Sequence, residues 1–215
     1  MSLPENQNVH HYCTQNVYEQ SCSITAWDQL YDQIHPGHFQ GELTEMLLDG
    51  MQLCSEYTNL ALRQSCMVQP GSFWLGIPIT QGSPGYIGSQ PIDEHRLAVS
   101  AGGEEFELNT PDEYRILGIV ISRDSLFQNT DMLVDQAQIS RLLTDPTALM
   151  VEPHKKAALC ALIHQMLSYG ATDAKQMLRG NAGKVINHNL LITLLDLLEN
   201  ASAQAPQTTG KQIGY

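Results

Sequence analysis

Residues 38–58, HFQGELTEMLLDGMQLCSEYT, contain the pattern that decides the fold. Apolar and polar side chains alternate on both sides of Asp49-Gly50, as they do in half-buried strands. Asp-Gly between two such runs is a strong hairpin signal, because both central residues of a type I′ turn need positive φ. The stretch therefore predicts two antiparallel strands joined by a tight turn.

Strand-like runs continue outward from this hairpin to about Ser122, and Gly or Pro separates them roughly every 8 to 12 residues. Two runs, FWLGIPI and ILGIVI, are nearly continuously apolar and are expected to form central strands. Short strands with this punctuation indicate a sandwich or barrel. The further strands are expected at 60–68, Ser72–Ile79, Tyr86–Gln90, Arg96–Val99, Glu105–Asn109 and Tyr114–Ile121.

Helical spacing appears at both ends of the chain. Trp27, Leu30, Tyr31 and Ile34 predict a short helix over Ser23–Ile34, and a longer helix is expected to begin at Glu152-Pro153. The segment Lys184–Asn200 has a broad apolar face that must be covered. Either a second chain covers it in a homodimer, or both helices pack on the barrel and on each other. The leucines predicted to pair two chains are Leu190, Leu191, Leu194, Leu195 and Leu198.

Composition narrows the class of protein. The 215 residues carry 11 Lys and Arg against 23 Asp and Glu, a net charge of −12, so this chain lacks the basic surface needed to bind DNA phosphates. Five cysteines without CxxC spacing argue against a disulfide framework or a zinc knuckle. The polar start has no signal-peptide pattern, and no run approaches the ~20 apolar residues of a membrane span. We expect a cytoplasmic protein without membrane contact.

Catalytic motifs are missing from the sequence. It has no H-x-H, no G-x-S-x-G, no Walker loop and no G-x-G-x-x-G, so we expect neither an enzyme nor a metal site. What remains is a ligand pocket inside the barrel. Phe73, Leu75 and Ile77 share one face of their strand, and Trp74 shares the other with Gly76. Four more candidates lie within strands, where the sequence favours outward, solvated positions over inward ones: Glu45, Arg63, Glu107 and Tyr114.

Several of these runs resemble one family. ITAW (24–27), EYTNLALRQSC (56–66), SFWLGIP (72–78) and EFELNTPDEY (105–114) are similar to the N-terminal half of the ethanolamine-utilisation regulators of the AraC family. The resemblance implies a mostly β fold with appended α: a cupin-like (double-stranded β-helix) barrel followed by an antiparallel helix pair. It also implies a transcription activator that responds to ethanolamine, with adenosylcobalamin as a second effector, and that binds DNA through a C-terminal domain absent from this chain.

The resemblance divides the chain into four segments. These are a flexible N-terminus (1–22), a sensor barrel (23–125), a helical dimerisation segment (126–200) and a linker (201–215). No family motif assigns the effector contacts. The small ethanolammonium ion calls for a carboxylate and an aromatic face, which Trp74, Tyr114, Glu45 and Glu107 could supply. Two alternatives stay open, a cupin-like metal-dependent enzyme and a purely structural dimerisation domain.

Overall fold

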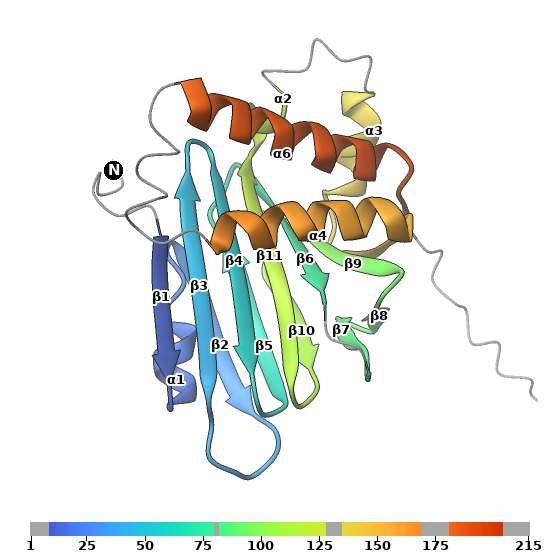
Figure 1. The fold of residues 1–215 in the computed structure, drawn as a ribbon. Coiled ribbons are helices and arrows are strands. Elements are labelled where there is room, and N and C mark those ends of the chain that lie inside the picture. Colours follow the sequence, from blue (N-terminus) through green and yellow to red (C-terminus); the bar gives the residue numbers. More distant parts are fainter. Residues whose placement is uncertain (1–8, 80–81, 128–134, 169–180, 204–215) are drawn as a thin grey trace, which may run out of the picture.

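The computed structural model describes residues 9–79, 82–127, 135–168 and 181–203, and it is built on two antiparallel sheets (Figure 1). The larger sheet has the order β1-β3-β4-β11-β6-β9-β12-β13 and the smaller one the order β2-β5-β10-β7-β8. The larger sheet contains β1 (Val9–Thr14), β3 (Gly41–Leu48), β4 (Met51–Thr58), β6 (Ser72–Pro78), β9 (Arg96–Ala101), β11 (Tyr114–Ser122), β12 (Thr147–Met150) and β13 (Ser202–Ala203). The smaller sheet contains β2 (Trp27–Gln33), β5 (Leu62–Val68), β7 (Gly85–Ile87), β8 (Gln90–Ile92) and β10 (Phe106–Thr110).

The predicted hairpin is present. β3 and β4 pair with Leu48 opposite Met51, and Gly50 has a φ of 69° in the turn between them. Asp49 does not have a positive φ, so the turn is not the type I′ turn that the Asp-Gly pair predicts. The two apolar runs form β6 and β11, which pair with each other at the centre of the larger sheet. A central strand is covered on both faces, which explains why these two lack the polar alternation of the hairpin.

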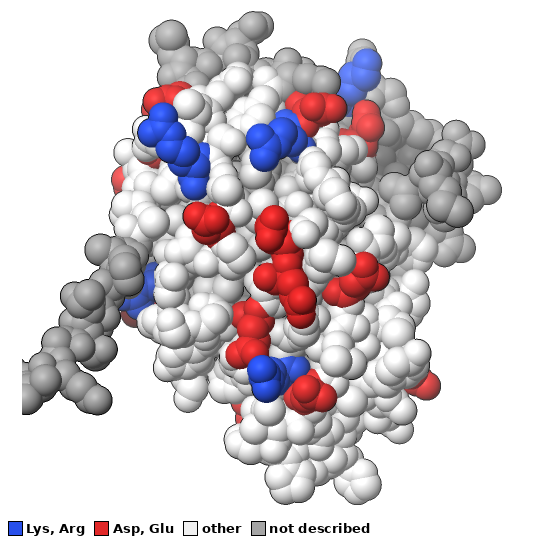
Figure 2. Space-filling model, turned by 180° about the vertical axis from the view of Figure 1, so that it is seen from behind, with Lys and Arg blue, Asp and Glu red and all other residues white. Residues whose placement is uncertain are grey.

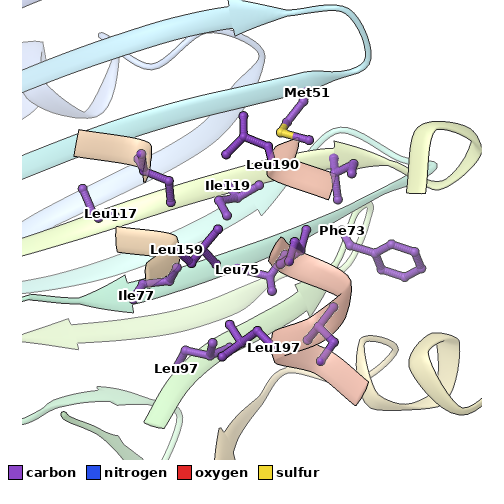
Figure 3. Packing of buried hydrophobic residues seen from close by; sticks show 14 of the residues in the cluster. Met51, Phe73, Leu75, Ile77, Leu97, Leu117, Ile119, Leu159, Leu190 and Leu197 are labelled. Carbon is purple, nitrogen blue, oxygen red and sulfur yellow. The ribbon is translucent and has the colours of Figure 1, made fainter. Parts of the chain in front are cut away.

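Helices cover the outer face of the larger sheet. α4 (Pro153–Leu167) and α6 (Asn181–Glu199) lie side by side across the strands (Figure 1). Leu75 and Ile119 of the sheet share one apolar core with Leu159 of α4 and Leu190 of α6 (Figure 3). The helices expected at these positions are therefore present. Three shorter helices complete the described chain: α1 (Val17–Ser21), α2 (Arg123–Phe127) and α3 (Gln136–Leu142).

The leucines predicted to pair two chains are buried within a single chain. Their exposed fractions are all 5% or less, and they belong to the core beneath α6: Leu190, Leu191, Leu194, Leu195 and Leu198. This is the alternative arrangement, in which the helices pack on the sheet of their own chain. Homodimerisation stays a prediction, and these five side chains leave little surface for it.

The helix predicted at Ser23–Ile34 is wrong. Residues 27–33 form β2, which pairs with β5 along its whole length. Tyr31 points inward and is 4% exposed, whereas Leu30 is 61% exposed. The apolar spacing fits the helical period better, since Leu30 and Tyr31 lie on opposite faces of the strand, and pairing with β5 overrides this local pattern.

Two further expectations need correction. Residues 9–14 and 17–21 of the expected flexible N-terminus form β1 and α1. The expected barrel is not closed, because no ladder between the described strands joins the two sheets; on one side α1 contacts both β2 and β3. At the opposite side, Gln90 Oε1 accepts hydrogen bonds from Thr147 Oγ1 and the Ala148 N–H in place of a ladder. Of the expected linker, 204–215 lie outside the described residues.

Candidate functional site

The space between the two sheets is more polar than a structural core requires. Alternation along β4 turns Leu53 toward the helices and Gln52, Cys54 and Glu56 toward the smaller sheet. Glu45 of the neighbouring strand β3 is opposite Cys54 in the register. Two carboxylates are therefore buried in the interior, Glu45 at 0% and Glu56 at 5% exposure. Charged groups are almost never buried without a partner, so their partners decide what the interior can do.

Neutral donors surround Glu45. The Thr25 N–H donates to Oε1 at 2.9 Å, and Thr25 Oγ1 donates to Oε2 at 2.7 Å. Gln52 Nε2 donates to Oε1 as well. These bonds fasten the chain entering β2 onto β3 and satisfy the carboxylate without neutralising its charge.

Glu56 lies farther along β4 and has fewer donors. Gln20 Nε2 of α1 donates to Oε1 at 2.9 Å, and Tyr31 OH donates to the same oxygen at 3.1 Å. Burial raises the pKa of the Glu56 carboxyl, against the lowering effect of these two hydrogen bonds. Burial also raises the pKa of the Cys54 thiol, which the carboxylates of Glu56 and Glu45 raise further. The Cys54 thiol therefore lies close enough to both carboxylates for their negative charges to act on it.

Where basic side chains of the described residues form ion pairs, their partners are carboxylates other than Glu45 and Glu56. The ion pairs found within the described ranges all lie nearer the surface, and none includes Glu45 or Glu56. Arg115, for example, lies on the opposite face of β11 and pairs with Glu42 at 2.8 Å. The interior thus combines two buried carboxylates with neutral donors and aromatic rings.

Three aromatic rings lie in the same interior as the carboxylates. Trp74 of β6 is stacked on Phe106 of the smaller sheet, with ring centroids 4.5 Å apart. Trp27 meets Trp74 edge-on at 5.9 Å, and its Nε1 donates to Gln52 Oε1 at 3.0 Å. Gly76 makes room for this arrangement, because a Cβ there would lie 2.4 Å from the Trp74 ring.

The structure joins two of the predicted site residues and separates the other three. Trp74 and Glu45 are connected through Trp27 and Gln52 in the interior. Tyr114 is also buried, at 2% exposure, but it lines a cleft next to α4. The remaining two, Arg63 and Glu107, face outward.

Arg63 and Glu107 form a surface ion pair. Arg63 Nη2 lies 2.6 Å from Glu107 Oε2 on the outer face of the smaller sheet. Asn109 and Arg63 donate to Glu107 and hold the pKa of its carboxyl below the usual value. Acidic side chains gather on the side of the molecule turned away from α4 and α6 (Figure 2). Both residues therefore take the outward, solvated position that the sequence favours.

Sequence reasoning missed the second carboxylate and its neighbours. Glu56 has the same strand parity as Gln52 and Cys54, so alternation in MQLCSEYT could have grouped them on one face. The helix predicted over Ser23–Ile34 does not indicate that Trp27 and Tyr31 share the inward face of a strand. Gln20 fell in the segment expected to be flexible.

Three surface clefts lined by described residues have the size of small-molecule sites, and Arg63 and Glu107 line the smallest of these three, which has about 460 Å³. One of about 660 Å³ lies between the β3–β4 turn and α6, and one of about 630 Å³ lies between β6, the β8–β9 turn and α4. Within the ranges that the structure describes, no group of three or more His, Cys, Asp and Glu is placed to hold a metal ion. None of the described helices is long and apolar enough to cross a membrane.

Fold and site together define a two-sheet β domain with a helical cover and a polar, aromatic interior. Among solved structures, the chain is similar to the AraC-like transcriptional activator CuxR, with a TM-score of 0.60 and 11% sequence identity. The match covers 93% of this chain and 73% of that one. No protein-family model matches the sequence. The chain therefore shares its overall fold with that structure.

Proposed function

We propose that this chain is the ligand-sensing domain of an AraC-type transcription activator and that its effector is ethanolamine. The observation that carries the proposal is the pair of buried carboxylates, Glu45 and Glu56, in an interior where Gln52 joins Glu45 to Trp27 and Trp27 meets Trp74 edge-on. The structural neighbour, a transcriptional activator, supports the regulatory role. The sequence resemblance supports the ligand.

Charge complementarity favours a cationic ligand. Moving a carboxylate out of water without a cation is unfavourable, and the raised pKa of Glu56 expresses that cost. An ammonium group bound between the sheets would stabilise the ionised carboxylates and would be attracted to the indole faces by about 0.5 to 2 kcal/mol. The ethanolamine hydroxyl can donate to Gln52 Oε1, which accepts from Trp27 and has a second lone pair, whereas both N–H donors of Gln52 are used by Glu45 and the Thr25 carbonyl.

Thermal unfolding with ethanolamine tests the proposal. A ligand at 100 times its Kd stabilises the native state by about 2.7 kcal/mol, so Tm should rise with ethanolamine concentration. Ethylene glycol lacks the charge and propylamine lacks the hydroxyl, so each should shift Tm less. An unchanged Tm at saturating ethanolamine would rule out this ligand.

A matched pair of variants locates the site. Glu45→Gln keeps the shape of the side chain and removes its charge, and it should weaken ethanolamine binding at least tenfold in calorimetry. Glu107→Gln removes a carboxylate from the outer face and should leave the affinity within twofold. Equal losses in both variants would place the effector outside the interior. Circular dichroism checks that Glu45→Gln folds, since Glu45 also fastens Thr25.

Dimer formation and the second effector belong to the same proposal. The regulator would act as a homodimer and bind DNA through a domain outside this chain. Titration with ethanolamine and adenosylcobalamin, singly and together, tests the second effector, because coupling between two binding sites must be reciprocal. Sedimentation that gives a monomer at high concentration would contradict the dimer.

A further inference from the structure

The cleft of about 630 Å³ beside α4 is separate from the carboxylates of the interior and has its own polar groups. Its floor contains Lys156 of α4 and Tyr114 of β11, which are 5% and 2% exposed. Its rim includes Asp93 and Glu94 from the β8–β9 turn. Apolar walls with a few convergent polar groups are typical of small-molecule sites of this volume.

Lys156 has a donor to spare. Its Nζ donates to the backbone carbonyls of Asp93 and Arg96, the latter at 3.1 Å. An ammonium group has three N–H donors, so one remains. No side-chain carboxylate is paired with Lys156 among the described residues, and burial lowers the pKa of this amine to about 8. An anion in the cleft would stabilise the buried charge.

Tyr114 supplies a second unused donor. Its hydroxyl is buried beside the Gly85 N–H, which acts on the phenol oxygen as a donor, and its own O–H donates to no residue that the structure describes. A buried O–H without an acceptor is unfavourable, so a ligand acceptor at this position would be favoured. Two donors at the floor of one cleft match the two oxygens of a carboxylate.

The rim has the opposite charge. Asp93 accepts hydrogen bonds from Arg96 Nη1 and the His95 N–H, and Glu94 lies 3.2 Å from His95 Nε2 with 78% of its side chain exposed. These carboxylates would repel a simple anion at the entrance. A ligand with an ammonium group near its carboxylate avoids this repulsion and gains an attraction.

We propose that this cleft is a second ligand site, which binds a zwitterionic amino acid with a small apolar side chain. The carboxylate of the ligand accepts from Lys156 Nζ and Tyr114 OH, and its ammonium group faces Asp93 and Glu94. The side chain lies against Ile92 and the neighbouring prolines of the lining. None of the described residues that line this site is one of the two interior carboxylates or their hydrogen-bond partners, so its tests are independent of whether ethanolamine binds in the interior.

Calorimetry with three matched probes tests the ligand class. L-valine carries both charges, isovalerate carries only the carboxylate and isobutylamine only the ammonium group. We expect L-valine to bind, isovalerate to bind at least tenfold more weakly and isobutylamine to give no heat. If neither L-valine nor L-alanine gives heat at concentrations well above about 1 mM, a Kd that already corresponds to weak binding, the proposal is overturned.

Variants then place the ligand in the cleft. Lys156→Met should weaken L-valine binding at least tenfold, and Tyr114→Phe should weaken it about threefold. Lys155→Met is the matched control, because Lys155 is the neighbouring lysine of α4 and pairs with Asp196 at 2.8 Å, away from the cleft. Unchanged affinity in a folded Lys156→Met variant would contradict the assignment.

Alkylation of Cys160 gives a readout in the unaltered protein, in case Lys156→Met does not fold. Cys160 lines the cleft, whereas Cys22 is exposed on another part of the surface. L-valine should slow the reaction of iodoacetamide with Cys160, measured by mass spectrometry, and leave Cys22 unaffected. Binding without protection of Cys160 would put the amino acid elsewhere and refute the proposed site. The Glu45→Gln variant should retain the protection, which separates this result from the outcome for ethanolamine.

Discussion

Replacement of Leu194 by Ala should show that α6 is part of the core of its own chain. Leu194 is 1% exposed and packs among the buried residues that join α6 to the larger sheet. Leu→Ala at such positions costs about 2 to 5 kcal/mol, because the lost transfer free energy is increased by a cavity. The larger sheet and α6 enclose this core, so the surrounding side chains cannot close the cavity that Ala leaves. We therefore expect the free energy of unfolding to fall by about 3 to 4 kcal/mol. Alanine keeps the helix intact, so the loss reports packing.

Urea denaturation followed by circular dichroism measures this loss. For a chain of 150–250 residues each kcal/mol lowers Tm by about 2 to 4 °C, so Tm should fall by about 6 to 16 °C. Val185→Ala is the matched control: Val185 belongs to the same helix and is 57% exposed, and it should cost less than about 0.5 kcal/mol.

Protein concentration distinguishes core packing from a dimer contact. Replacing a core leucine by Ala lowers the free energy of unfolding equally at every protein concentration. Replacing an interface leucine lowers it by an amount that depends on protein concentration through mass action. A loss below about 1 kcal/mol, or one that disappears on dilution of both proteins, would refute the assignment of Leu194 to the core of the single chain.

Two further changes probe the interior. Because burial raises the pKa of Glu56, the folded state binds a proton there more strongly than the unfolded chain, and its contribution to stability falls as pH rises from the ordinary carboxyl pKa toward the raised one. Glu56→Gln should remove that part of the pH dependence in urea titrations run upward from the ordinary carboxyl pKa, while the exposed Glu104→Gln should not. Gly118→Ala would place a Cβ 2.5 Å from Cys54 Sγ, so we expect a loss of about 1 to 3 kcal/mol. The exposed Gly88 has open space around its Cα but a φ of 55°, so Gly88→Asn tests surface tolerance in the same assay and should cost under about 1 kcal/mol.

Prediction from sequence succeeded where local chemistry decides. The Asp49-Gly50 turn and the apolar runs of β6 and β11 carry their own signals, and Pro153 marks the first turn of α4. It failed for β2, where the apolar residues of WDQLYDQ follow the helical period although the segment forms a strand. There the choice depends on pairing with β5, which local periodicity does not contain.

Only part of the candidate site could be predicted. Alternation puts Trp74 on one face of its strand and Phe73 and Leu75 on the other, but it does not say which face points between the two sheets. For Glu45 the sequence favoured the outward position, and the structure places it inward, bound to Thr25 and joined to Trp27 through Gln52.

By itself, then, the sequence determined a mostly β chain with a central hairpin, two fully buried strands and an apolar helix near its end. Only the tertiary structure decided that this helix covers its own sheet and that Glu45 and Glu56 share the interior with Trp27 and Trp74. The physical reason is the range of the interactions. Turn and cap preferences act over a few residues, whereas burial of a carboxylate depends on donors that strand register brings from 20 or more positions away, such as Thr25 N–H.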